Sequence, residues 1–108
     1  MAYRVEITRR AEVDLEDLYL WVVEQASERV ARWFNGLERA VLSLDQHPER
    51  CAEAPESFDA NRPVRVLLYG RKPHTYRIFF IIDDDAETVR VLHVRRGARQ
   101  RPMADELR

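Results

Sequence analysis

The chain has 108 residues, enough for one domain, and its single cysteine excludes an intrachain disulfide. Its net charge of −1 hides two opposite halves: residues 1–60 carry 7 Arg against 13 Asp and Glu, whereas residues 61–108 carry 10 Arg and one Lys against 6. Because the apolar runs are shorter than a membrane helix and the start lacks a signal pattern, we expect a single cytoplasmic domain, residues 1–108, whose second half meets an anionic partner.

The first half of the chain predicts one strand and two helices. Apolar and polar residues alternate over residues 3–7, which is the period of a strand with one buried face. Thr8 is positioned to cap a helix whose apolar stripe runs to Ala26, and Ser27 to cap a second helix that ends at Pro48. Because almost no loop separates the two helices, we expect them to fold back as an antiparallel hairpin.

The second half predicts three strands after an irregular connection over residues 48–63, which contains three prolines. The strands are Val64–Tyr69, Thr75–Asp83 and Thr88–Arg95, joined by short turns that require antiparallel pairing. The middle run is apolar on both faces, as in a central strand. We therefore predict an α+β fold in the order strand-helix-helix-strand-strand-strand, with the helix hairpin on one face of a four-stranded, mainly antiparallel sheet. The other face is left for solvent or a ligand.

Arginines in and after these strands are the main candidates for function. Arg77 alternates with apolar residues that should face the helices, so it points to the open face, and the same parity places Arg65 and Arg90 there. Guanidinium groups suit phosphate and carboxylate partners. The alternative is a solvated sheet face on which arginines pair with Glu6, Glu87 or the aspartates. The candidate target-binding or anion-binding set is Arg65, Arg77, Arg90, Arg95, Arg96, Arg99 and Arg101.

His93 and two tryptophans are further candidates. His93 lies near the end of the last strand, where it suits a general acid or base, but its parity with the apolar residues of that strand also fits a packed structural residue. Trp21 and Trp33 flank the helix stripes, which indicates core or rim packing first and a partner contact second. The aspartates at 83–85 lack the spacing of a calcium loop, and no zinc motif or phosphate-binding glycine loop is present. We expect no metal and no cofactor.

Three segments together resemble a known family. The opening YRVEITRRAEVDLEDLYLWV, the central YRIFFIIDDD and the ending VRVLHVRRGARQRP are similar to the RelE/ParE superfamily of bacterial toxins, from type II toxin–antitoxin modules. The likeness spans nearly the whole chain. It implies a RelE-like fold and a small, acidic antitoxin, encoded adjacently, that neutralises the toxin. The candidate antitoxin contacts are Trp21, Trp33, Arg65 and Arg77.

The resemblance implies two possible activities. RelE-like members cut messenger RNA on the translating ribosome, and on that reading the catalytic candidates are Arg77, His93, Arg95 and Arg99. ParE-like members inhibit DNA gyrase and lack this nuclease set. Lys72 is the only lysine, no tyrosine follows residue 76, and the ending HVRRGAR looks more like the ParE side, so we favour a gyrase inhibitor. A non-catalytic interaction module that holds an acidic partner is the third hypothesis. None of the three takes a small-molecule substrate.

Overall fold

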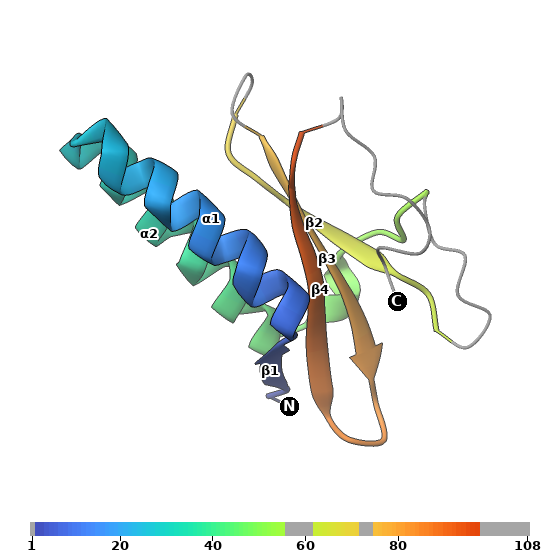
Figure 1. Ribbon diagram of the computed structural model, residues 1–108. Coiled ribbons are helices and arrows are strands. Elements are labelled where there is room, and N and C mark those ends of the chain that lie inside the picture. The colour runs from blue at the N-terminus through green and yellow to red at the C-terminus, as the bar shows by residue number, and fades with distance from the viewer. Residues whose placement is uncertain (1, 56–61, 72–74, 98–108) are drawn as a thin grey trace.

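Two helices and a four-stranded sheet make up the fold (Figure 1). The computed structural model describes residues 2–55, 62–71 and 75–97. The predicted α+β fold and its element order are confirmed, although the second helix ends before Pro48, where the chain tightens into two 3₁₀ turns. In chain order the elements are β1 (Arg4–Ile7), α1 (Arg9–Gln25), α2 (Glu28–Leu42), η1 (Ser43–Asp45), η2 (Pro48–Arg50), β2 (Arg65–Tyr69), β3 (Tyr76–Asp83) and β4 (Thr88–Arg96).

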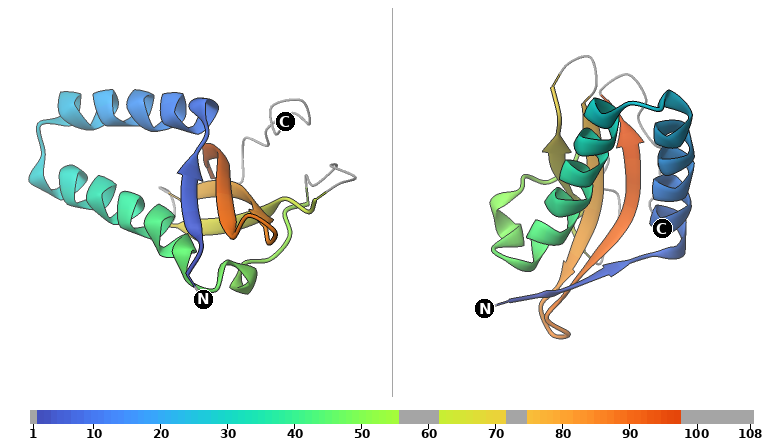
Figure 2. Two further views of the ribbon diagram at one scale, coloured as in Figure 1. Left: turned by 90° about the horizontal axis from the view of Figure 1, so that it is seen from below. Right: turned by 90° about the vertical axis from the view of Figure 1, so that its left-hand side faces the viewer.

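Two predicted caps define the helix hairpin formed by α1 and α2. Thr8 Oγ1 accepts from the Ala11 N–H at 3.3 Å, and Ser27 Oγ accepts from the Val30 N–H at 3.3 Å. Ala26 ends α1 in the left-handed conformation, with φ at 48°, and turns the chain directly into α2. The connected ends of the two helices project beyond the sheet (Figure 2). No helix within the described ranges is long and apolar enough to cross a membrane.

The strand order in the sheet is β1-β4-β3-β2, so β3 is an interior strand, as predicted. β1 pairs parallel with β4, and the other two pairs are antiparallel. The helix-facing side of the sheet meets the apolar stripes of both helices in one core, which holds the helix hairpin against the sheet. Buried members of this core include Leu18, Phe34, Leu37, Ile78, Phe80 and Val91.

The opposite face of the sheet is partly covered, which corrects the prediction that it is left open. Phe79 lies on this face and is fully buried, in a second cluster with Ala54 and Val64. The connection before β2 supplies the cover: the Ala54 N–H donates to Val64 O at 2.8 Å, and the Val66 N–H donates to Ala52 O at 3.0 Å. An apolar residue on each face of β3 requires a second small core, and the irregular connection provides it.

Candidate functional site

The arginines predicted to share one face lie in separate environments. Arg77 in β3 and Arg95 in β4 are cross-strand neighbours at the open end of the β3–β4 hairpin, the end away from its turn. Arg77 faces away from the helices, as predicted, but it is only 9% exposed, and its guanidinium carbon lies 4.7 Å from the centroid of the Phe79 ring. Arg99 and Arg101 lie outside the described residues. In place of an open face, this end of the hairpin carries a partly buried arginine pair.

Arg65 is on the opposite side of the sheet from Arg77, which corrects the prediction. Arg65 pairs with Phe80 across the strands, whereas Val66 pairs with Phe79. Cross-strand partners share a face, and Phe80 belongs to the helix-side core, so Arg65 lies on the helix side. Its Nη1 donates to the Cys51 carbonyl at 2.6 Å. The prediction was wrong because the apolar residues that flank Arg65 cover the second cluster rather than the helix core.

Arg90 faces away from the helices, as predicted, but carboxylates hold it. Its Nη1 lies 3.2 Å from Asp83 Oδ2, and its Nε lies 3.8 Å from Glu6 Oε1. Arg62 Nη1 approaches the other oxygen of Asp83 at 3.0 Å. Hydrogen bonds from the Ala86 N–H first, and then from Arg62 and Arg90, lower the pKa of Asp83 against the effect of burial. The ion-paired alternative is confirmed for Arg90. Asp83 binds both Arg62 and Arg90 at the turn end of the β3–β4 hairpin.

His93 is buried at an irregularity of β4. Phe79 pairs with His93 and Phe80 with Val91, so a β-bulge leaves Leu92 as an extra residue between them. The bulge interrupts the parity by which His93 was grouped with Val91. The His93 side chain is nevertheless 1% exposed, so the packed alternative is confirmed although the parity argument for it was wrong.

Asp14, which was not among the predicted site residues, ties α1 to the edge of β4. Its Oδ2 accepts from the Val94 N–H at 3.0 Å and lies 3.6 Å from His93 Nδ1. Arg95 Nη2 lies 3.4 Å from the same histidine nitrogen. Burial alone raises the pKa of Asp14, but hydrogen bonds from His93 and Val94, together with the charge of Arg95, lower it overall. The ionised carboxylate therefore fixes the part of β4 that extends beyond β1.

A groove of 1270 Å³ lies between the helix hairpin and the open end of the β3–β4 hairpin. We call it the arginine groove. Trp21, which is 42% exposed, and Trp33 form part of its apolar lining. Asp14 and Asp17 are its acidic residues. Its basic residues are Arg29, Arg71, Arg95 and Arg96, of which Arg29, Arg71 and Arg96 make no ion pair within the described part of the chain. The groove presents cations beside aromatic surface.

The arginine groove contains both predicted and unpredicted residues. Four predicted residues line it, namely Trp21, Trp33, Arg95 and Arg96. Arg29 and Arg71 were missed, because the start of α2 and the turn after β2 approach β4 only in the folded chain. The excess of arginine in the second half of the sequence was the only signal for Arg71, and no sequence signal singled out Arg29.

Aromatic contacts support the Trp33 side of the groove. The Trp33 ring centroid lies 5.7 Å from that of Tyr69 and 5.2 Å from that of Tyr76. Tyr69 Oη donates to the Trp33 carbonyl at 2.8 Å. Gly36 permits this approach, since a methyl group there would overlap the Tyr69 hydroxyl. Burial raises the pKa of Tyr76, and the charge of Arg96 opposes the increase. Helix α2 thus meets β2 and β3 through aromatic residues.

The arginine groove is suited to binding by charge and apolar contact. Arginine side chains can engage a carboxylate or a phosphate through two parallel hydrogen bonds, and the tryptophans offer apolar area beside them. His93, the candidate acid, is buried and does not line the groove. Within the ranges that the structure describes, no group of three or more His, Cys, Asp or Glu residues could hold a metal ion.

Comparisons with known proteins relate the sequence and the fold to toxins. Residues 5–101 match the family described as ParE toxin of the type II toxin-antitoxin system, parDE. The fold is similar to the chromosomal ParDE system from P. aeruginosa, with a TM-score of 0.67 and 23% identity over 90% of this chain and 98% of that chain. It is also similar to the toxin–antitoxin complex RelBE2 from Mycobacterium tuberculosis, with a TM-score of 0.59 and 23% identity over 91% and 94%. A mutant of E. coli RelE in the free state gives a TM-score of 0.56 and 15% identity over 89% and 84%. No curated protein sequence matched.

Proposed function

Because the match covers residues 5–101, the chain belongs to the ParE toxin family of type II toxin–antitoxin systems, and we propose that it arrests growth by inhibiting DNA gyrase. The predicted membership of the RelE/ParE superfamily is thereby confirmed. In this proposal the protein acts in the cytoplasm, as a binding protein and not as an enzyme, and a cognate antitoxin neutralises it.

The burial of His93 is the observation that favours gyrase inhibition over RNA cleavage. A general acid must reach the leaving oxygen of its substrate within about 3 Å, directly or through one water molecule. His93 is 1% exposed, and its Nδ1 faces Asp14 and Arg95. Arg77, one of the predicted nuclease arginines, is only 9% exposed. These positions suit a structural network better than an RNA-cleaving centre.

The arginine groove is the proposed antitoxin site. Its cations without ion pairs attract an acidic segment, and Trp21 and Trp33 offer apolar area that such a segment would bury. Aromatic and arginine residues contribute most of the binding energy in many protein interfaces. We therefore expect the antitoxin to be a small, acidic protein encoded next to the toxin, and to place carboxylates against Arg29, Arg71 and Arg96.

The gyrase proposal is tested with purified protein and purified DNA gyrase. Expression of the chain alone should stop growth, and co-expression of the adjacent acidic protein should restore it. The purified chain should inhibit supercoiling of relaxed plasmid in a dose-dependent manner, and the purified antitoxin should reverse that inhibition. Normal supercoiling at a large molar excess of the chain would rule out gyrase as the target.

A ribosome-dependent ribonuclease is the alternative, and the Arg77–Arg95 pair is the observation that favours it. Two arginines paired across neighbouring strands suit the extra negative charge on a phosphate during cleavage. In that case the purified chain should cut messenger RNA in the ribosomal A site, and an Arg77→Ala variant should lose the cuts. A non-catalytic interaction module is the third alternative, and it predicts normal growth when the chain is expressed alone.

A further inference from the structure

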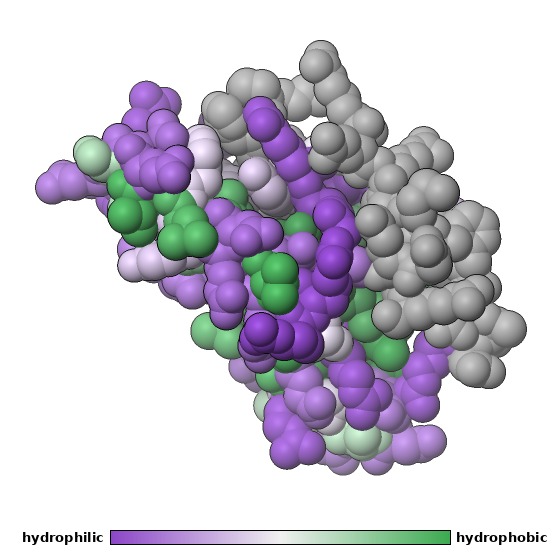
Figure 3. Space-filling model, viewed as in Figure 1, coloured by the Kyte–Doolittle hydropathy of each residue, from purple (hydrophilic) through white to green (hydrophobic). Residues whose placement is uncertain are grey.

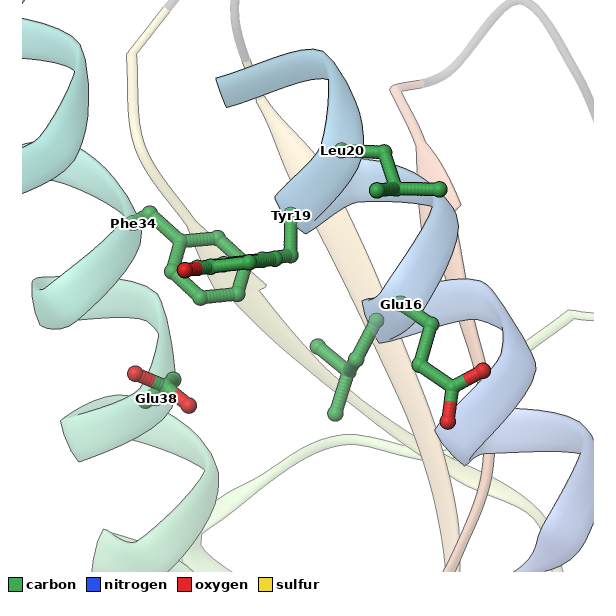
Figure 4. Close-up of a pocket in the computed structure, with 6 residues that line it drawn as sticks. Glu16, Tyr19, Leu20, Phe34 and Glu38 are labelled. Atoms are coloured by element: carbon green, nitrogen blue, oxygen red, sulfur yellow. The ribbon is translucent and has the colours of Figure 1, made fainter. Parts of the chain in front are cut away.

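A second cavity lies on the helix hairpin, away from the arginine groove. It has a volume of 420 Å³ and lies between α1 and α2. Its lining residues are Leu15, Glu16, Tyr19, Leu20, Phe34 and Glu38. We call it the outer cleft. Figure 4 shows Tyr19 of α1 directed toward Phe34 of α2 across this space, with Glu16 and Glu38 on opposite sides. The two rings lie 5.7 Å apart between centroids, at 56°.

The outer cleft and the arginine groove use opposite faces of α1. The groove takes residues 14, 17, 18, 21 and 25, whereas the cleft takes residues 15, 16, 19 and 20. At about 100° per residue, the two sets are centred on opposite sides of the helix. Variants can therefore alter one surface without altering the other.

The apolar part of the outer cleft is unusually open to solvent. Tyr19 is 52% exposed and Leu20 is 61% exposed, and Val23 continues the exposed apolar surface along α1. Figure 3 shows hydrophobic patches over the helix hairpin among hydrophilic residues. Because the apolar side chains stand at the edge of the cleft, a small ligand would leave them in water. A protein segment laid across the two helices would cover them.

The charge around the outer cleft indicates which kind of protein segment it binds. Glu16 and Glu38 flank the apolar surface, and neither carboxylate makes an ion pair within the described ranges. Such a rim repels nucleic acid and an acidic antitoxin, whereas it attracts lysine and arginine. The chemistry is the reverse of that in the arginine groove.

We infer that the outer cleft docks a basic segment of the target protein, which inserts an apolar side chain between Tyr19, Leu20 and Phe34 and places cations against Glu16 and Glu38. The inference rests on the proposed function, because it assumes that the segment bound in the cleft belongs to the target of the toxin. DNA gyrase is therefore the probe. It separates the two partners: the acidic antitoxin uses the arginine groove, and the target uses the outer cleft.

Two sets of variants test the inference, each with a matched control. Glu16→Arg with Glu38→Arg reverses the charge at the rim of the cleft, and Glu49→Arg with Glu53→Arg makes the same charge change outside α1 and outside both cavities. Leu20→Ser removes an apolar contact, and Leu42→Ser removes an equally exposed leucine, also 61%, from α2 outside the cleft. Because all these side chains are exposed, the variants should fold, which circular dichroism and thermal unfolding would verify.

The readouts are inhibition of supercoiling by purified gyrase, growth arrest on expression, and co-purification with the antitoxin. The two cleft variants should need a roughly tenfold higher concentration for half-inhibition, whereas their controls should stay within about twofold of the wild type. The cleft variants should also lose growth arrest and still bind the antitoxin.

Failure of the inference differs from failure of the proposed function. If the wild-type chain inhibits gyrase and the cleft variants inhibit it equally well, the inference is wrong and the gyrase proposal stands. If the wild-type chain leaves gyrase unaffected, the gyrase proposal is wrong, and growth arrest by the same variants then decides the inference. Full growth arrest by the cleft variants, or loss of antitoxin binding in them, would also overturn it.

Discussion

An aspartate holds each end of the β3–β4 hairpin, but only one end leaves arginines available. At the turn end, Asp83 binds Arg62 and Arg90 at 3.0 and 3.2 Å. At the open end, Asp14 reaches across from α1 to the Val94 N–H and to His93. The arginine groove adjoins the open end, and its arginines outnumber its carboxylates.

The difference shows that an arginine's role depends on the carboxylates around it. Arg90 has its charge balanced by Asp83 and Glu6, so it contributes to the fold. Arg96 is exposed and has no ion pair in the described part of the chain, so its charge is open to a partner. The turn end is therefore structural in our account, and the open end is functional.

The largest effect should be on antitoxin affinity, which arginine variants at the open end of the β3–β4 hairpin should reduce and those at the turn end should not. Arg29→Ala with Arg96→Ala removes two groove cations and should weaken antitoxin binding by roughly a hundredfold, because desolvated arginines are common hot spots. Arg90→Ala at the turn end should leave the affinity within about threefold and lower the thermal unfolding midpoint instead. Titration calorimetry measures the affinities.

The matched control for the groove variant is Arg32→Ala with Arg39→Ala, two exposed α2 residues outside both cavities. It removes the same charge without touching the groove. If the control weakens antitoxin binding as much as the groove variant does, the effect is one of net charge, and the assignment of the groove fails.

The second-largest effect should be the loss of stability when Asp14, the aspartate at the open end, is removed. Asp14→Ala leaves the buried Val94 N–H without its acceptor and removes the negative charge beside His93, so we expect a loss of about 2 kcal/mol in the free energy of unfolding. Asp17→Ala, one turn later and exposed, should change it by less than about 0.5 kcal/mol. Urea denaturation measures both, and equal stabilities would contradict the tie between α1 and β4.

A smaller loss of stability is expected from a substitution at Gly36, on the aromatic side of the groove. Gly→Ala in a helix normally stabilises a protein by roughly 1 kcal/mol. At Gly36 the sign should reverse, because the added methyl displaces Tyr69 from its hydrogen bond to Trp33. We expect a net loss of about 1 kcal/mol, with a change in tryptophan fluorescence as the Trp33 environment opens. A more stable Gly36→Ala variant with unchanged fluorescence would show that α2 tolerates the methyl.

The pH dependence of stability should be the smallest effect near neutral pH. The pKa of Asp14 and that of Asp83 are both lowered in the fold from 3.8, so each stabilises the protein above that value. That stabilisation should be constant down to about pH 5 and lost as the pH falls through the lowered pKa values. Asp14→Ala should make the acid-side decline shallower, and Asp17→Ala should not. An unchanged decline in Asp14→Ala would exclude the carboxylate as a source of it.

The fold was predictable where the signals are local. The caps at Thr8 and Ser27, the helix stripes and the two-sided apolar pattern of β3 each depend on neighbouring residues, and all are confirmed. The site was less predictable because it depends on distant contacts. No sequence pattern signals the bulge before His93, and Asp14 meets β4 across 80 positions of the chain.

The same limit explains the error at Arg65. Alternation gives two faces for each strand but does not say which face meets the helices when both have apolar residues to bury. The second cluster around Phe79 supplied the missing information, because it places the neighbours of Arg65 on the face away from the helices. Gly36 was missed for a similar reason, since its role appears only when Tyr69 is placed against α2.

Amide hydrogen exchange of the chain, alone and bound to its antitoxin, would show which end of the β3–β4 hairpin the antitoxin covers. It compares the open end and the turn end of the β3–β4 hairpin in one experiment. We expect antitoxin binding to slow exchange at the start of α2, around Arg29 and Val30, and at the exposed end of β4 near Arg96, with no change at Asp84–Glu87. Protection of the turn at Asp84–Glu87, with none in the arginine groove, would contradict the account.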